Sequence, residues 1–355
     1  MEKQETKNTE APIFVVGLSR SGTTLMTDIL NRHSEVYIVP ETHYFDDLRM
    51  KMASNLNKPL NEQQIKYIED YFLALTDKFY MTGGDPEKGW MDRMDLRNLA
   101  QSIKNQNIID AYFEAYCRIY VDKKENKTRW GEKTPRHVFN IKEMLTCYPN
   151  AKIICMIRHP GAVVASYRDF AKNEWSEKER VSSDNQRITS SYNIITISLL
   201  WRGAFNAALT AFEEFGENKI YIQRFEDLVL NPEATMTKIT EWLSIPYEPS
   251  ILDVSLVGSS YAKTWAVSGK GFAKESASRW REKLSDLEIA VVQSCCGNLL
   301  DKGNYEREKT NASFLNILWY WITFPFAVLR ALIANQDRIG NIPKYIWSRL
   351  KLAVK

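Results

Sequence analysis

The clearest pattern along the chain is a set of short, mostly apolar runs separated by longer segments with helical periodicity. Runs of this kind, bounded by glycine, proline or charged residues, are typical of strands in a buried parallel sheet. The four runs are PIFVVG (12–17), VYIV (36–39), AKIICMI (151–157) and KIYIQR (219–224). The run 151–157 is apolar almost throughout, so we expect it near the centre of the sheet.

Helical periodicity fills most of the sequence between these strands. Apolar residues recur every three or four positions in 23–32, in the segment that starts at 160, and in 189–215, 232–243 and 285–300. Strands that alternate with helices favour right-handed crossover connections. The pattern therefore predicts an α/β fold, with a parallel sheet flanked by helices.

Two segments depart from this alternation. Residues 44–125 have a helical pattern without a strand, which predicts a helical insertion beside the sheet. The segment WGEKTPRHV (130–138) is interpreted as a loop that enters a helix. In that interpretation Thr134 is the N-cap and Pro135 occupies the first helical position.

Composition changes this picture only slightly. The chain has 355 residues, of which 44% are hydrophobic and 26% charged, with a formal net charge of +3. These values are typical of a globular protein and do not indicate the strongly basic face of a nucleic-acid-binding protein. We expect one domain over 12–305, between a disordered tail at 1–11 and a helical tail at 306–355.

The cysteines and the N-terminus bear on location. The first eleven residues, MEKQETKNTEA, are polar and lack the apolar core of a signal peptide. The chain has five cysteines, an odd number without metal-ligand spacing, and we expect them to be buried free thiols. Both features predict a cytoplasmic protein in a reducing compartment.

The C-terminal tail is unusually aromatic. The run FLNILWYWITFPFAVL (314–329) carries no charge, and Arg330 and further basic residues follow it. Because it is short for a spanning helix and contains Pro325, we expect it to lie on an anionic bilayer through 314–355, as a peripheral helix on the inner face of the membrane. A helix packed on the domain or in a dimer contact is the alternative, and the sequence predicts no oligomeric state.

The sequence GLSRSGTT (17–24) follows the first strand and opens the first helix. Glycines five positions apart in this context predict a phosphate-binding loop, whose backbone N–H groups and helix N-terminus hold an anion. The predicted anion-binding residues are Ser19, Arg20, Ser21, Gly22, Thr23 and Thr24. Thr23 stands where a nucleotide hydrolase would have lysine, and the loop has Arg20 instead.

The end of the predicted strand 151–157 also lacks a residue that a nucleotide hydrolase needs. Hydrolases of nucleoside triphosphates place an aspartate there to support Mg²⁺, whereas 151–157 is followed by Arg158. A second guanidinium predicts a ligand with two separated anionic groups and no metal. 3′-Phosphoadenosine 5′-phosphosulfate (PAPS) fits, with its phosphosulfate on the loop and its 3′-phosphate on Arg158 and Ser166.

Four motifs occur in order along the chain: PIFVVGLSRSGTT, WGEKTP, IICMIRHPGAVVASY and RFEDLVLNP. Together they resemble the PAPS-dependent sulfotransferases, nearest in style to the tyrosylprotein and bacterial enzymes, and the resemblance covers about 12–300. It implies a fold related to the P-loop NTPases and PAPS as donor.

Catalytic roles follow for three residues. Arg20 is placed to stabilise the transferring sulfuryl group. Glu41 follows the second strand at the edge where α/β sheets bind ligands, and its spacing from Arg20 is similar to that of the catalytic glutamate in tyrosylprotein-type enzymes. We expect Glu41 to be the general base, with His43 as the rival, and Lys133 matches a family lysine that contacts the phosphosulfate.

Other positions are less well defined. Phe225 stands where many bacterial relatives have tyrosine, so a hydroxyl contact is lost there. The Gly-, Ser- and Lys-rich segment 258–281 is predicted to be a loop that crosses the site. Its candidates to cover the 3′-phosphate are Lys270, Lys274 and Arg279.

The acceptor and two alternative functions stay open. The acceptor is a hydroxyl of a glycan, a lipid or a tyrosine, and the aromatic residues that could stack on it are Trp90, Trp130, Trp175 and Tyr167. A nucleotide kinase or NTPase would need an acidic Mg²⁺ ligand at a strand end. The third hypothesis is a non-catalytic nucleotide-binding scaffold.

Overall fold

We describe the protein from a computed structural model. The description covers 11–56, 58–76, 91–104, 107–124, 127–172, 192–255 and 271–334. Several sequence predictions lie outside these ranges: the tail 1–10, the segment 256–270 with Lys270, the aromatic residues Trp90 and Trp175, and the basic C-terminus 335–355.

The chain forms two compact units. The first comprises Met1–Arg158, Ala204–Leu256 and Ser268–Lys274, and it contains the sheet. The second comprises His159–Gly203, Val257–Val267 and Glu275–Lys355. Helix α10 (Ile194–Phe215) contributes residues to both units.

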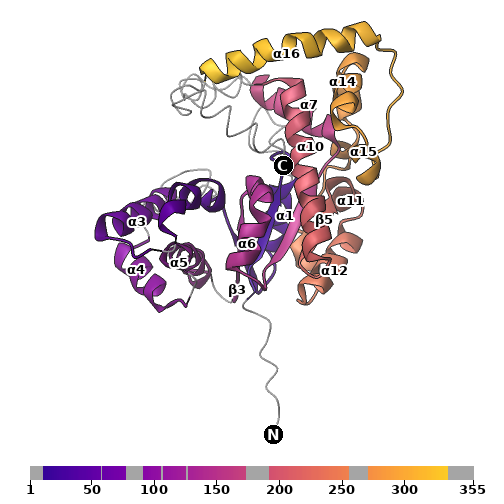
Figure 1. Ribbon diagram of the computed structural model, residues 1–355. Helices are drawn as coiled ribbons and strands as arrows, with labels where there is room; N and C mark the ends of the chain where they lie inside the picture. The colour runs from indigo at the N-terminus through magenta and orange to yellow at the C-terminus, as the bar shows by residue number, and fades with distance from the viewer. Residues whose placement is uncertain are drawn as a thin grey trace. The chain divides into compact units, whose positions relative to one another are not determined.

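The first unit is built on a parallel sheet of five strands in the order β2-β3-β1-β4-β5. Two of these strands, β3 and β5, are labelled in Figure 1. The strands are β1 (Ile13–Gly17), β2 (Val36–Val39), β3 (Arg129–Lys133), β4 (Lys152–Ile157) and β5 (Ile220–Arg224). All pairs are parallel, which confirms the predicted α/β class. Strand β1 is central, and its carboxyl end leads into the Gly-rich loop.

Strand β3 corrects the interpretation of WGEKTPRHV as a loop. Gly131 pairs with Ile13, and a side chain on Gly131 would lie 2.2 Å from the Ile13 carbonyl oxygen. The strand was missed because three of its five residues are charged, which hides it from a hydrophobicity pattern. Its charged side chains are buried with partners, as when Arg129 donates to the carbonyl oxygens of Ala11 and Leu243, each at 2.7 Å.

Helices cover the sheet and form the predicted insertion in the first unit. The elements after β1 and β2 are α1 (Thr23–Leu30), the π-helix η1 (Tyr44–Leu48), α2 (Arg49–Lys51), η2 (Ala53–Asn55), α3 (Glu62–Thr76), α4 (Arg93–Ser102) and α5 (Ile108–Asp122). Those after β3 and β5 are η3 (Pro135–Asn140), α6 (Ile141–Cys147), α11 (Phe225–Leu230), α12 (Pro232–Leu243) and η4 (Pro249–Leu252). Pro135 opens η3 as predicted, but the Thr134 side chain makes no capping hydrogen bond.

Aromatic side chains join the insertion to the sheet. Phe113 of α5 stacks on Tyr44 with ring centroids 4.3 Å apart and meets Phe14 of β1 at 6.4 Å. Trp130 lies in the same cluster, 4% exposed, with its ring 5.9 Å from that of Phe14. Trp130 is therefore a core residue and has no free face on which an acceptor could stack.

The second unit is helical. Beside part of α10 it contains α7 (Pro160–Lys172), most of η5 (Lys274–Ala277), α13 (Trp280–Lys283), α14 (Asp286–Cys296), α15 (Leu299–Lys302) and α16 (Phe314–Ala334). Gly161 permits α7 to approach α13, because a side chain there would lie 2.5 Å from the Trp280 ring. All five cysteines are free and buried, as predicted.

Candidate active site

The loop between β1 and α1 has the backbone of an anion-binding turn. Its three left-handed positions are Gly17, Arg20 and Gly22, with φ of +146°, +73° and +91°. Gly17 is required, since a Cβ there would lie 2.3 Å from the carbonyl oxygen of Met156 on β4. Arg20 holds a conformation that non-glycine residues rarely adopt and that is often found at functional sites.

The Ser21 hydroxyl and the start of helix α1 offer hydrogen-bond donors to a ligand of this loop. Helix α1 begins at Thr23 without a side-chain cap, so its first N–H groups are available to an anion. The Ser21 hydroxyl is 1% exposed and has no hydrogen-bond partner. An unpaired buried hydroxyl beside such N–H groups fits a phosphate or sulfate oxygen, as the sequence predicts for Ser19 to Thr24.

The side chains of Glu41 and Lys133 form an ion pair at the carboxyl end of the sheet, near the strand that leads into this loop. They follow or end the adjacent strands β2 and β3, and the Lys133 Nζ lies 2.7 Å from the Glu41 Oε1. The Lys133 side chain is 10% exposed and the Glu41 side chain 28%, so the carboxylate is the more accessible of the two. Because Lys133 also pairs with Val15 of β1 in the sheet, the strand order holds the ion pair next to the strand that leads into the loop.

His43 lies on the other side of Glu41. Its Nε2 is 3.5 Å from Glu41 Oε2 and its Nδ1 is 3.2 Å from Asp46 Oδ1. Burial alone would lower the pKa of His43, but the hydrogen bond and charge of Asp46 and the charge of Glu41 raise it above its ordinary value. A histidine with a raised pKa is more often already protonated near neutral pH, and the protonated ring cannot accept another proton.

A buried network, defined here as Thr42, Glu132, Thr134, His137 and Asp46, supports this pair. Glu132 is fully buried and accepts hydrogen bonds from the Thr42 N–H at 3.0 Å and the Thr42 hydroxyl at 2.8 Å. Thr134 donates a third to the same oxygen. The network therefore fixes the backbone between Glu41 and His43 to the end of β3.

His137 joins the two carboxylates of this network. Its Nδ1 lies 3.1 Å from Glu132 Oε2 and its Nε2 lies 3.4 Å from Asp46 Oδ1. Burial would lower the pKa of His137, but the charge of Glu132 and the hydrogen bond to Asp46 raise it to about 9. This place of His137 could not be predicted from the sequence, because its partners Glu132 and Asp46 lie on separate elements.

Arg158 contacts the anion loop from the end of β4. Its Nη1 donates to the Arg20 carbonyl oxygen at 3.1 Å, and its guanidinium carbon lies 4.2 Å from the centre of the Phe225 ring. The same ring fills the space beside Gly22, where a Cβ would lie 2.4 Å from Phe225 Cδ2. Phe225 thus packs under the loop, a role that its position just after β5, at the same sheet edge, could have suggested.

The remaining predicted donor-site residues are not brought together by these observations. Ser166 is buried on α7 and Arg279 precedes α13, both in the second unit, whereas Arg158 and Lys274 belong to the first. The assignment of Arg158, Ser166, Lys274 and Arg279 to a 3′-phosphate stays a prediction. Tyr167, also on α7, is partly exposed.

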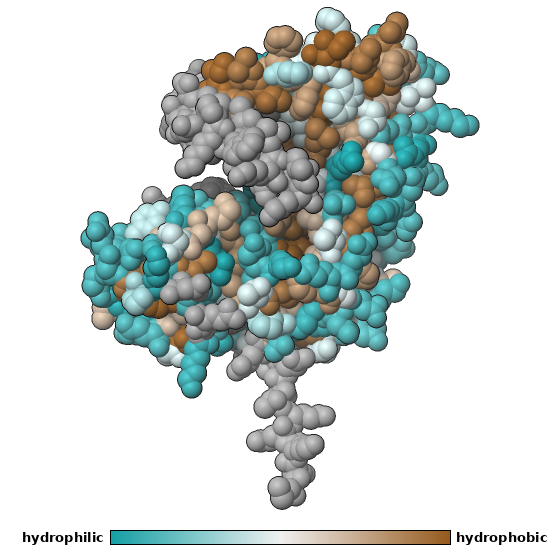
Figure 2. Space-filling model, in the orientation of Figure 1, coloured by the Kyte–Doolittle hydropathy of each residue, from teal (hydrophilic) through white to brown (hydrophobic). Residues whose placement is uncertain are grey.

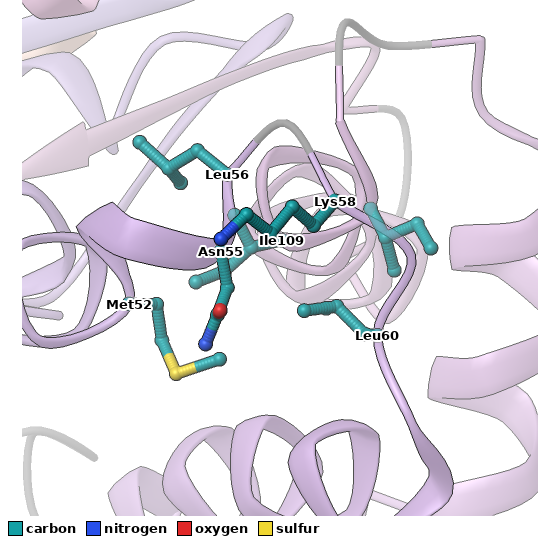
Figure 3. A pocket seen from close by; sticks show the side chains of 7 residues that line it. Met52, Asn55, Leu56, Lys58, Leu60 and Ile109 are labelled. Carbon is teal, nitrogen blue, oxygen red and sulfur yellow. The ribbon is translucent and has the colours of Figure 1, made fainter.

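Two further features concern metal ligands and a pocket away from these residues. Within the described ranges, no group of three or more histidine, cysteine or acidic residues is arranged to hold a metal ion. A pocket on the helical insertion contains none of the predicted site residues (Figure 3). It is lined by Met52, Asn55, Leu56, Lys58, Leu60, Ile108 and Ile109.

The sequence of this chain is similar to those of several known proteins. A profile of the sulfotransferase family matches residues 12–249. Protein-tyrosine sulfotransferase A of Caenorhabditis elegans is 26% identical over 240 residues, which cover 68% of this chain and 51% of that protein. The nodulation protein NoeE of Sinorhizobium fredii is 22% identical over 315 residues, covering 84% of this chain and 67% of that protein.

The chain spans about half the length of the first of these relatives. Among solved structures, the sulfotransferase domain from the curacin biosynthetic pathway is similar with a TM-score of 0.50 and 18% identity, covering 84% of this chain and 99% of that domain. At this identity the likeness concerns the fold, and it confirms the predicted P-loop-like sulfotransferase fold. Since the family profile matches more than half of the sequence, the chain belongs to the sulfotransferase family.

Proposed function

We propose that this chain transfers the sulfuryl group of PAPS to a hydroxyl group, with Glu41 as the general base. The observation that carries the proposal is the Glu41–Lys133 contact at 2.7 Å, formed at the ends of two adjacent strands beside the strand that leads into the anion loop. This arrangement combines an exposed proton acceptor, a cation and an anion cradle at one sheet edge.

The donor fits the residues of the loop. The free N–H groups at the start of α1 and the unpaired Ser21 hydroxyl suit the phosphosulfate oxygens, and Arg20 adds a positive charge within the loop. Arg158, which contacts the Arg20 backbone, is the second fixed cation at this edge. Together these groups would neutralise the donor without a divalent ion, so we propose metal-independent transfer.

Each residue then has a chemical task. Glu41 accepts the proton of the acceptor hydroxyl as its oxygen attacks the sulfur atom in line with the leaving phosphate oxygen. The sulfur–oxygen bond to the phosphate breaks, and Arg20 and Lys133 stabilise the negative charge that develops on the leaving oxygen. The raised pKa of His43 favours Glu41 over His43 as the base and gives His43 the task of positioning the carboxylate.

The names of two relatives suggest which acceptor to test first. Protein-tyrosine sulfotransferases of animals match this chain, so we include a tyrosine hydroxyl in the proposal beside saccharide and lipid-linked hydroxyls. We also propose a cytoplasmic location, since five buried free cysteines are typical of a reducing compartment.

The proposal is tested with donor labelled in its sulfuryl group and a panel of the three acceptor classes, in the presence of EDTA. We expect a labelled product, and we expect Glu41→Gln to lower the rate by about 100- to 10,000-fold, the usual contribution of a general base. His43→Gln should cost about tenfold or less, and Glu143→Gln, on an exposed part of α6, is the matched control with the parent rate.

Three results would contradict the proposal. Glu41→Gln that folds and reacts at the parent rate would remove Glu41 as the base. Hydrolysis of ATP that depends on Mg²⁺ and stops in EDTA would favour a nucleotide hydrolase. Tight binding of adenosine 3′,5′-bisphosphate without product from any acceptor would favour a non-catalytic scaffold.

A further inference from the structure

Helix α16 carries many exposed apolar side chains, and in Figure 2 brown and tan residues gather along it, interrupted by a few paler ones. It spans Phe314–Ala334, and its first sixteen residues include no charged side chain. In the described part of the chain, two helices are long and apolar enough to cross a membrane, and they differ in burial. The window in α10 is 50% buried, as in a core helix, whereas the window Phe314–Ile333 is 6% buried.

One side of α16 is held on the second unit. The helix contacts α14, and its partly or fully buried positions recur every three or four residues. They are Ile317, Tyr320, Thr323, Phe324, Ala327, Val328, Ala331 and Leu332. The segment before the helix is tied to α14 as well, because the Glu308 N–H donates to Gln293 Oε1 at 2.7 Å and the Asn311 N–H to Asp286 Oδ2 at 3.1 Å.

The opposite side of α16 is apolar and open to solvent. We call it the outer strip, and it consists of Leu315, Trp319, Ile322, Phe326, Leu329 and Ile333. Leu315, Trp319 and Phe326 are 73%, 63% and 72% exposed. Their spacing of three, four and seven residues makes one stripe, whereas exposed apolar side chains on ordinary protein surfaces are scattered singly.

The sequence that follows indicates what covers the outer strip. Arg330 ends the uncharged stretch, and residues 331–355 contain five basic residues against one acidic residue. An apolar strip rich in tryptophan and phenylalanine, joined to basic residues, complements an anionic lipid surface. A second copy of this chain would bring two positively charged segments together, which disfavours a dimer through this strip.

We propose that the outer strip of α16 docks the protein on an anionic phospholipid bilayer, with the helix lying in the plane of the interface. The contact of the other side with α14 argues against a spanning helix, because a helix surrounded by lipid would have to leave that contact. Pro325 lies inside the helix and weakens a transmembrane arrangement further. The proposal does not depend on the chemistry at the sheet edge.

The test measures binding of the full chain to sedimented vesicles of phosphatidylcholine, alone or mixed with phosphatidylglycerol. We expect binding to the mixed vesicles that weakens with added salt, and little binding to phosphatidylcholine alone. Trp319→Ala combined with Phe326→Ala should lower the partition coefficient by about tenfold or more, because two large apolar side chains no longer enter the interface. Phe212→Ala, an exposed aromatic on α10, is the matched control and should bind like the parent.

Four outcomes would overturn the proposal. Failure of the parent chain to sediment with either kind of vesicle would exclude lipid docking, and equal binding of the double variant would exclude the outer strip as the docking surface. A parent that forms dimers and a double variant that forms monomers, without lipid binding, would assign the strip to a second copy. Resistance of the bound protein to extraction at alkaline pH would show a spanning helix instead of an interfacial one.

Discussion

The carboxyl edge of the sheet and helix α16 depart from the usual distribution of side chains in opposite directions. The sheet edge buries charge: Glu132 and His137 are fully buried, and Lys133 is nearly so. Helix α16 does the reverse and exposes Trp319 and Phe326 to water. Each departure has a cost, since buried charges lose hydration and exposed apolar surface orders water.

The two regions differ in where the compensation comes from. At the sheet edge every described member of the buried network has a partner on another element of the same unit, as with Glu132, which contacts both Thr42 and His137. Among the described residues, helix α16 contacts α14 on one side and exposes the outer strip on the other. The buried network is therefore compensated within the chain, whereas our proposal assigns the outer strip to a lipid surface.

We expect the greatest loss of stability from a substitution that removes a charged partner inside the buried network. Glu132→Gln removes the negative charge that faces His137 while it keeps the shape of the side chain. We expect the free energy of unfolding to fall by about 3 kcal/mol, because a buried cation loses one of its two carboxylate partners. Unfolding in urea at pH 7 measures the change, and Glu143→Gln on the exposed face of α6 is the matched control.

The pH dependence separates this explanation from a simple packing defect. The pKa of His137 is about 9 in the folded protein and 6.5 ordinarily, so its protonated form stabilises the fold fully below pH 6.5, and this contribution disappears as the pH rises through 9. The difference in stability between the parent and Glu132→Gln should therefore shrink from pH 7 to pH 10. A difference that stays constant over this range would contradict the charge interaction.

A smaller change in stability is expected at Asp28 of α1, where nearby positive charges offset the burial of the carboxylate only in part. Burial raises the pKa of Asp28 from 3.8 to about 6, although the charges of Lys133 and Arg32 oppose the rise. Because the folded-state pKa is the higher one, the ionised carboxylate costs stability above pH 6 and the cost vanishes below about pH 4. Asp28→Asn should stabilise the protein by about 1 to 2 kcal/mol at pH 8.

The measurement for Asp28→Asn is the free energy of unfolding at pH 8 and pH 4, with Asp122→Asn at an exposed position as control. At pH 4 the variant and the parent should be equally stable. Equal stability at pH 8 as well would show that the carboxylate is hydrated in the folded protein.

The sequence predicted the parts of the fold that depend on local pattern. The apolar strands β1, β2, β4 and β5 and the Gly-rich loop were found because their residues show the periodicity and turn chemistry directly. Strand β3 was missed, since RWGEK becomes strand-like only when neighbouring elements supply partners for Arg129, Glu132 and Lys133. Non-local pairing of this kind leaves no signal in a single segment.

In the candidate site too, single residues could be predicted from local motifs, whereas contacts between distant segments could not. Glu41 and Lys133 were each proposed from motif spacing, and the structure shows that they contact one another. The support from His137 could not be predicted, because it depends on which strand ends are adjacent in space, whereas the position of Phe225 just after β5 could have suggested its place under the loop. Strand order, which a single sequence specifies only through packing, therefore decides which charges meet.

The least change in stability is expected for substitutions in the outer strip of helix α16. If the outer strip of α16 has no partner within the chain, then Trp319→Ala and Phe326→Ala should change the free energy of unfolding without lipid by less than about 0.5 kcal/mol each. Leu332→Ala, on the packed side of the same helix, is the matched contrast, since Leu332 is 9% exposed and its loss should cost about 2 kcal/mol. Unfolding in urea, followed by circular dichroism, measures all three variants. A loss at Trp319 or Phe326 as large as that at Leu332 would mean that the strip is covered by the protein itself, and the two regions would then be compensated in the same way.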